Sequence, residues 1–240
     1  MIESTTSRHT RFVIPAKRVF STLMAITCSL TLLSILSLLT TQLPVENYWL
    51  KELIASLVRL FDTNGEANIP TWYSSSTLLM ASALLVVVIY FKARVADSYL
   101  LHWKFLAIVF LYLSLDETAM IHEMLNKPLS SILHTDGLLS YPWILAAGLC
   151  LILLLFAYAR FLLHLPSNTR ILFISAGIIF VLGAIGAECL GAYNHSQDTT
   201  NGLAYRIPMT IEEFFEMTGV ALFIYALMLY LNEHVIKDAS

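Results

Sequence analysis

The side chains with the clearest capacity for chemistry form one short polar group at the end of an apolar run that begins near Phe105. The group consists of Asp116, Glu117, His122 and Glu123. Carboxylates and imidazoles transfer protons and bind cations, so these residue types point to acid–base or cation chemistry. At about 100° per residue, Asp116 and Glu123 share one helical face, and the other two residues flank it.

Two later apolar runs carry further acids. Glu188 lies in the first of these runs, and the second begins with Glu212, Glu213 and Glu216. Thr210 and Glu213 have the spacing of a helix capping box, and acids favour helix N-termini, so capping alone could explain Glu212 and Glu213. Glu216 lies one turn deeper, where capping cannot explain it.

Together these residues predict a site made of carboxylates and one histidine. As acid–base groups we expect Asp116, Glu117, His122 and Glu123. As metal ligands we expect Asp116, His122, Glu123, Glu188, Glu212 and Glu216. Carboxylates with one histidine suit iron, manganese or zinc, and carboxylates alone suit magnesium or calcium, so the expected cofactor is a divalent metal. The Glu-x-x-His spacing of helical di-iron sites is absent, because Ala119 precedes His122 by three residues.

Each acid also has a structural interpretation. Asp116 and Glu117 could form a polar bridge between helices, whereas His122 and Glu123 could face water near a membrane surface. Such a bridge would fix the register of the helices without any chemistry. These alternatives stay open at the level of the sequence.

Composition shows which elements must position these groups. Of 240 residues, 58% are hydrophobic and only 13% are charged, against about 25% charged residues in a typical soluble domain. This balance predicts an all-α, polytopic transmembrane bundle that forms one integral membrane domain over residues 1–240. The net charge of −3 gives no indication of a nucleic-acid partner.

Six apolar runs are long enough to cross a hydrocarbon core of roughly 30 Å. They cover residues 19–41, 74–91, 104–125, 142–163, 171–193 and 210–231, each range being approximate. Between the first two runs, apolar side chains recur every three to four residues over about 46–61, which predicts an amphipathic helix at the membrane interface.

The basic residues predict the orientation of the bundle. The N-terminal tail and the connections after the second and fourth runs are rich in lysine and arginine, whereas the alternate connections are poorer relative to their length. By the positive-inside rule, both termini lie in the cytoplasm and the protein lies in the inner membrane. The acids of the third, fifth and sixth runs then share one depth below the periplasmic surface, with Glu216 roughly 8 Å below it.

Carboxylates at this depth need compensation. A charged side chain near the bilayer centre costs about 2.5–3.5 kcal/mol, and the cost is smaller near the edge. The basic residues on the same side are Lys51, Arg59, Lys127 and Arg206, and none lies within an apolar run. We therefore expect the acids to share protons, to open to a water-filled cavity, or to bind cations.

The remaining patterns indicate packing. Gly183, Ala187 and Gly191 repeat every four residues in the fifth run, which favours close helix–helix approach, and Gly219 could admit a neighbouring helix in the sixth. The cysteines are Cys28, Cys150 and Cys189; they lie inside apolar runs without metal-site spacing.

Three functions are consistent with these observations. The first is a metal- or cation-dependent enzyme acting on a membrane lipid or a lipid-linked substrate. The second is a transport protein that uses the acids as a proton or cation site. The third is a non-catalytic accessory subunit that docks other membrane subunits through its polar cluster. The inner halves of the runs contain no matching acids, which argues against a continuous polar path across the membrane.

Overall fold

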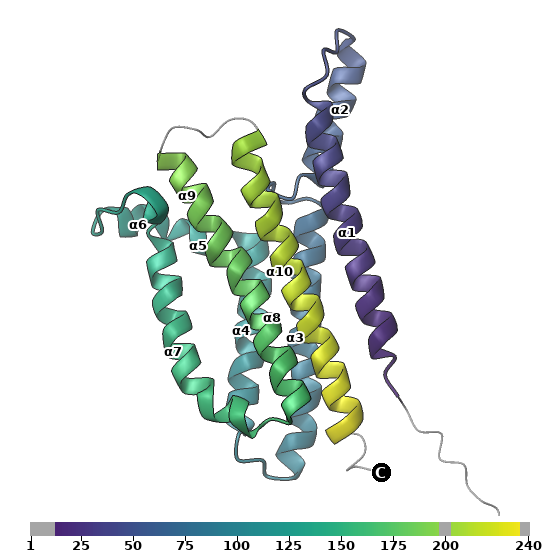
Figure 1. The fold of residues 1–240 in the computed structure, drawn as a ribbon, viewed down its shortest axis with the longest axis vertical. Coiled ribbons are helices and arrows are strands. Elements are labelled where there is room, and N and C mark those ends of the chain that lie inside the picture. The colour runs from purple at the N-terminus through teal and green to yellow at the C-terminus, as the bar shows by residue number, and fades with distance from the viewer. Residues whose placement is uncertain (1–12, 197–202, 236–240) are drawn as a thin grey trace, which may run out of the picture.

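The protein is a bundle of long helices (Figure 1), and its computed structural model describes residues 13–196 and 203–235. Every regular element in these two ranges is helical, which confirms the predicted fold class. Five helices in the described ranges are long and apolar enough to cross a membrane, and a bent helix pair makes a sixth candidate. The five are α1 (Ala16–Thr40), α3 (Ile69–Arg94), α7 (Trp143–His164), the run of α8 (Ser167–Val181), η2 (Leu182–Ala187) and α9 (Glu188–Ser196), and α10 (Leu203–Tyr230), which continues into η3 (Leu231–Val235).

The bent pair replaces the straight helix that the sequence predicted over 104–125. Helix α4 (Leu100–Ala119) ends at Met120, whose φ of 51° and ψ of 40° lie in the left-handed region. The chain then continues as α5 (Ile121–Met124) and α6 (Asn126–Ser130), at 72° to α4. A short 3₁₀ turn, η1 (Gly137–Leu139), leads on towards α7. The polar group at 116–123 therefore lies at a bend.

Helix α10 is the centre of the bundle. It packs against α1, α3 and α8, and 61% of its most apolar stretch is buried, against 17% for α7. An aromatic cluster joins it to two outer helices: the Trp103 ring lies 5.3 Å from Tyr230 and 4.8 Å from Phe161 between centroids. A side chain on α10 is thus surrounded by helices from several parts of the chain.

Small residues let α10 approach its neighbours closely, as predicted. A Cβ added to Gly183 would lie 2.7 Å from the backbone oxygen of Glu212, and one added to Gly219 would lie 2.8 Å from the backbone nitrogen of Phe180. These contacts place η2 and the acidic part of α10 side by side. By contrast, a Cβ at Gly177 or Gly186 would meet no atom within 4 Å.

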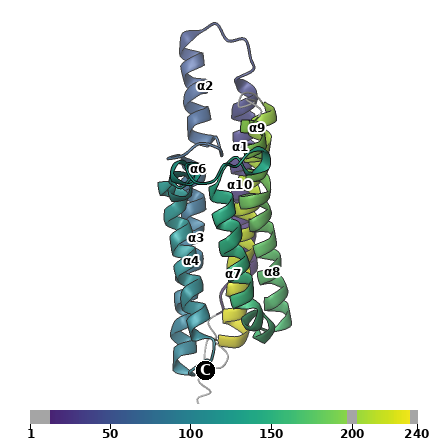
Figure 2. The ribbon, with the colours of Figure 1, turned by 90° about the vertical axis from the view of Figure 1, so that its left-hand side faces the viewer.

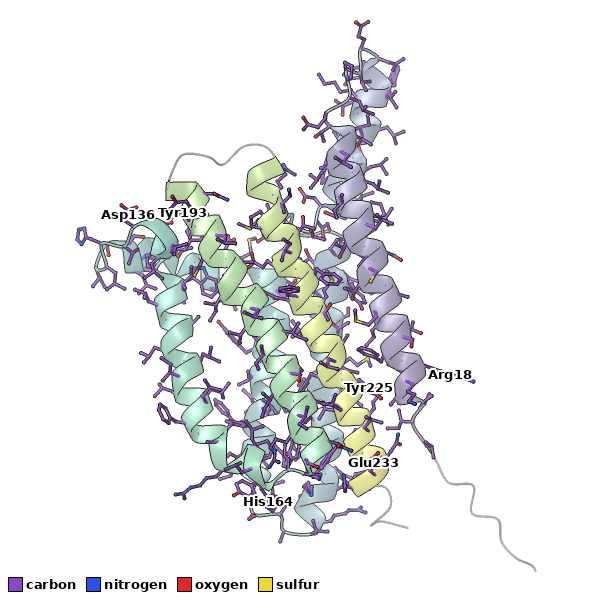
Figure 3. All side chains as sticks on the ribbon, viewed as in Figure 1. Arg18, Asp136, His164, Tyr193, Tyr225 and Glu233 are labelled. Atoms are coloured by element: carbon purple, nitrogen blue, oxygen red, sulfur yellow. The ribbon has the colours of Figure 1, made fainter. Side chains whose placement is uncertain are left out.

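The residues of the predicted site lie towards one of the two ends of the bundle. Figure 3 shows Arg18, His164 and Glu233 near one end, and Asp136 and Tyr193 near the opposite end. The acids of the predicted site lie towards the Asp136 end, because Glu188 begins α9 and the acids of α10 lie in its first half. We call this the acidic end.

Helix α2 (Tyr48–Phe61) confirms the predicted amphipathic helix, and the side chain of Asn47 caps it by accepting a hydrogen bond from Leu50 N. Figure 2 shows α2 standing along the long axis of the molecule beyond the end of α3. None of its residues is buried, and the large side chains Trp49 and Leu53 are 78% and 55% exposed. The helix therefore presents apolar surface outside the bundle.

Candidate functional site: an acidic centre

Asp116 and His122 form the most tightly defined contact at the acidic end. Asp116 Oδ1 accepts a hydrogen bond from His122 N, and Asp116 Oδ2 lies 2.8 Å from His122 Nδ1. The left-handed conformation of Met120 turns the chain back so that both contacts form. Because both carboxylate oxygens of the buried Asp116 bind one residue, the imidazole is held in a fixed orientation and only Nε2 stays open to other partners.

Trp143 connects this pair to the next acid. Its ring lies 4.6 Å from the His122 ring between centroids, and its Nε1 donates a hydrogen bond to Glu188 Oε1 at 3.3 Å. A second contact, from Trp143 N to Asn126 Oδ1 at 3.3 Å, ties the start of α7 to α6. Trp143, on α7, thus contacts side chains of both α5 and α9.

Glu188 and Glu212 form a carboxyl pair. Their side chains lie within hydrogen-bonding reach of each other, from α9 and α10 respectively. Glu212 Oε2 is buried, and no donor among the described residues hydrogen-bonds to it. Two carboxyl groups can approach in this way only around a shared proton or a cation.

The rest of the acidic face of α10 meets α4. The carboxyl of Glu213 interacts electrostatically with Glu117, Glu216 and Glu188, and that of Glu216 with Glu117, Glu188 and Asp116. The side chain of Glu117 also hydrogen-bonds to Ser74 on α3. All three glutamates are half-buried, so each keeps part of its surface open to water-sized molecules.

The loop between α2 and α3 supplies a further acid at the mouth of the site. Glu66 is exposed and interacts electrostatically with Glu123 and His122. Partial burial and the nearby Glu123 carboxylate raise the pKa of Glu66, and the favourable interaction with His122 offsets only part of this. Its neighbour Asn68 instead caps α3 by accepting a hydrogen bond from Thr71 N at 3.1 Å.

The structure therefore brings most of the predicted site residues into one neighbourhood. Asp116, Glu117, His122, Glu188, Glu212, Glu213 and Glu216 interact with one another from α4, α5, α9 and α10. Glu123 lies at the exposed edge. We call this set, with Glu66, the acidic centre.

The capping interpretation of Glu212 and Glu213 is wrong. Helix α10 already begins at Leu203 and runs through Pro208, so Thr210 lies inside the helix and its Oγ1 donates back to Arg206 O at 3.1 Å. The two glutamates therefore stand in the helix body, where no free backbone N–H groups compensate their charge.

Arg206 is the basic residue nearest in sequence to the acids of α10, but it is bound elsewhere. Its Nη1 donates to Asp62 Oδ2 at 2.7 Å, which ties α10 to the loop that carries Glu66. Within the described ranges, no lysine or arginine forms an ion pair with a member of the acidic centre.

Four of the six predicted metal ligands occur as two pairs. Among residues 13–196 and 203–235, no group of three or more His, Cys, Asp or Glu side chains is arranged to hold a metal ion. Asp116 and His122 bind each other, and Glu188 and Glu212 face each other. A cation that keeps most of its own water and binds through one or two carboxylates fits this arrangement; magnesium binds in this way.

Sequence reasoning missed two residues of the site, Trp143 and Ser74. Neither belongs to an acidic motif, and both touch the acidic centre only because α7 and α3 pack beside it. The single signal for Trp143 was its position directly after Pro142, at the start of an apolar run.

A family model described as a domain of unknown function (DUF8692) matches residues 22–231, a range that includes every member of the acidic centre. No curated protein and no solved structure matches the chain.

Proposed function

The chain belongs to the DUF8692 family, whose description names no activity, and we propose from the geometry of the acidic centre that it is a cation-dependent membrane enzyme acting on a lipid or lipid-linked substrate. One observation carries this proposal: carboxylates from separate helices converge at one end of the bundle, and Glu188 and Glu212 approach each other without a basic partner among the residues that the structure describes. Such a pair has a high affinity for protons or cations.

The Glu188–Glu212 pair is the best candidate for holding the cation. Its donor set consists of oxygen atoms, which suits magnesium or calcium better than softer metals. A bound divalent cation would supply a Lewis acid and would attract an anionic headgroup into an otherwise negative site. Glu216 and Glu213 would add negative charge around it.

His122 is the best candidate for a general base. Asp116 holds Nδ1 and the adjacent Trp143 ring, tilted by 51°, restricts the imidazole, so Nε2 is the nitrogen left to accept a proton from a substrate or a water molecule. Asp116 acts through His122 and is in this proposal a positioning residue.

The membrane setting supports a proposed orientation and a proposed substrate class. The distribution of lysine and arginine favours cytoplasmic termini and an acidic centre at the periplasmic side of an inner membrane. A site at that depth, open to the lipid and to water, favours a substrate whose headgroup lies at the membrane surface.

Cation binding by the purified full chain in detergent tests the proposal. We expect added Mg²⁺ to stabilise the protein, by about 2.7 kcal/mol at a hundredfold excess over Kd. Glu188→Gln and Glu212→Gln should both remove this stabilisation, whereas Glu52→Gln, on the exposed α2, should keep it. Wild-type protein that gains no stability from Mg²⁺, Ca²⁺ or Mn²⁺ would contradict a cation-dependent function.

A second function is favoured by a different observation. Helix α2 has no buried residue and exposes Trp49, Leu50 and Leu53 beyond the bundle. This surface would suit an accessory subunit that docks another membrane protein. A stoichiometric partner that co-purifies with the wild type, and is lost on Leu50→Ser and Leu53→Ser substitution, would support this function.

A further inference from the structure

A lateral groove separates α4 from α7. Its volume is about 490 Å³, within the roughly 300–1,000 Å³ of typical ligand pockets. The groove is lined by Leu101, His102, Phe105, Cys150, Leu153, Leu154, Ala157 and Tyr158. Figure 1 shows α7 at the edge of the bundle, set apart from α4 along its middle.

The groove exists because α7 is held mainly at its two ends. Near the acidic end, Trp143 bonds to Glu188 and Asn126. Near the other end, Tyr158 OH donates to His102 O at 2.7 Å. Between these anchors few residues of α7 are buried, and Leu153 is 60% exposed.

The walls of the groove suit a hydrocarbon chain. The Tyr158 hydroxyl is already bound to His102 O, and the Nδ1 atom of His102 is buried rather than exposed in the groove. Leucine, phenylalanine and alanine carbons make up most of the remaining surface. A polar ligand would therefore find few hydrogen-bonding partners there, whereas an acyl chain would lose nothing by entering.

The groove leads towards the acidic centre. The Tyr112 hydroxyl on α4 interacts electrostatically with both Asp116, in the centre, and Cys150, in the groove wall. At 1.5 Å per residue, the rise from Phe105 to Asp116 is about 16 Å. This length is close to half of a hydrocarbon core of roughly 30 Å, which is the depth of one leaflet.

We infer that this groove holds an acyl chain of the substrate lipid while the headgroup of the same molecule lies at the acidic centre. The inference rests on the proposed function and specifies its substrate class: a lipid with a chain about one leaflet long, entering sideways between α4 and α7. The chain would anchor the molecule, and His122, held by Asp116, would meet its headgroup.

Photocrosslinking of the full chain in vesicles tests this inference. The vesicles would contain phosphatidylethanolamine and a phosphatidylglycerol that carries a diazirine near the end of one acyl chain. After illumination, mass spectrometry maps the modified residues. We expect adducts to concentrate on the groove residues Leu101, Phe105, Leu153, Leu154 and Ala157, and to be lost in Ala157→Trp, which fills the groove. The matched control, Ala159→Trp, lies on α7 outside the groove wall and should keep them.

Adducts spread evenly over α7, including Ile152 and Phe156, would overturn the inference, because they would show ordinary contact with bulk lipid. So would equal labelling of Ala157→Trp and the wild type. Mg²⁺ binding to the same samples separates the two proposals. If Mg²⁺ binds but the adducts are evenly spread, only the acyl-chain groove is overturned. If adducts concentrate in the groove but no cation binds, only the cation-dependent function is overturned.

Discussion

Asp116 accepts a backbone hydrogen bond and contacts the ring of a single residue, His122, both at 2.8 Å, across the break between α4 and α5. One carboxylate therefore caps a broken helix and orients an imidazole. This double role explains why an acid can lie buried at the end of a membrane-spanning helix: both of its oxygens are satisfied by the segment that the break releases.

Removal of this carboxylate should destabilise the protein. We expect Asp116→Ala to lower the free energy of unfolding by about 1–3 kcal/mol, because His122 N and Nδ1 lose their partner in a partly buried place. Thermal unfolding in detergent, followed by circular dichroism, measures the change. Thr118→Ala is the control, since this exposed hydroxyl bonds only to Leu115 O within its own helix. An equal effect of both substitutions would show that the Asp116–His122 contact contributes nothing.

The left-handed conformation of Met120 predicts an unusual response to glycine. Left-handed backbone costs an L-residue roughly 1–2 kcal/mol, so Met120→Gly should leave stability unchanged or raise it, and Met120→Val should lower it. If residues 104–125 formed a straight helix, Met120→Gly would instead lower the stability, because glycine inside a helix costs about 1 kcal/mol. Unfolding curves of the two variants distinguish these geometries, with Ala119→Gly as the reference for a helical position.

The ion pair between Asp62 and Arg206 should couple α10 to the loop that carries Glu66. The Arg206 side chain is 39% exposed, so solvent screens the pair and we expect a coupling energy of about 1 kcal/mol or less. A double-mutant cycle with Asp62→Asn and Arg206→Gln measures it. The coupling should fall with added salt. Strictly additive effects of the two substitutions at low salt would show that the pair does not form.

The raised pKa of Glu66 predicts a pH-dependent contribution to stability. An acid whose pKa is higher in the folded state binds its proton more tightly there, so its stabilising contribution is present below the ordinary glutamate pKa, and it is lost as the pH rises through the raised value. Wild type and Glu66→Gln should therefore have similar melting temperatures near pH 4, and Glu66→Gln should be the more stable at pH 7. Melting temperatures over this range test the sign. The control Glu52→Gln, on α2 and away from Glu123, should show no such pH-dependent difference in melting temperature from the wild type.

Two glycines one turn apart should respond differently to alanine. Gly183→Ala places a Cβ 2.7 Å from the Glu212 backbone oxygen, which must move; we expect a loss of about 1–3 kcal/mol and weaker Mg²⁺ binding. Gly186→Ala meets no atom within 4 Å and should stabilise the helix by up to about 1 kcal/mol. Unfolding and Mg²⁺ titration of both variants measure the contrast. Equal tolerance at both positions would show that η2 does not approach α10 as closely as described.

Local properties of the sequence were enough to predict the helical bundle and the amphipathic helix before α3. Length and hydropathy determine which segments can cross a bilayer, and both are read from neighbouring residues. The same local information led to the incorrect capping box at Thr210, because a proline such as Pro208 usually indicates a helix boundary, whereas α10 runs through it.

The tertiary structure decided how the acids are grouped. No glycine or proline next to Met120 indicates that the helix breaks there. The break is accompanied by a hydrogen bond from His122 N to Asp116 Oδ1. Similarly, Glu188 faces Glu212, and Glu117 faces Glu213, because Gly183 and Gly219 let α10 approach its neighbours and thereby set the rotation of each helix. Residue types and depth are properties of each segment, whereas the pairing of side chains depends on close packing between segments far apart in the chain.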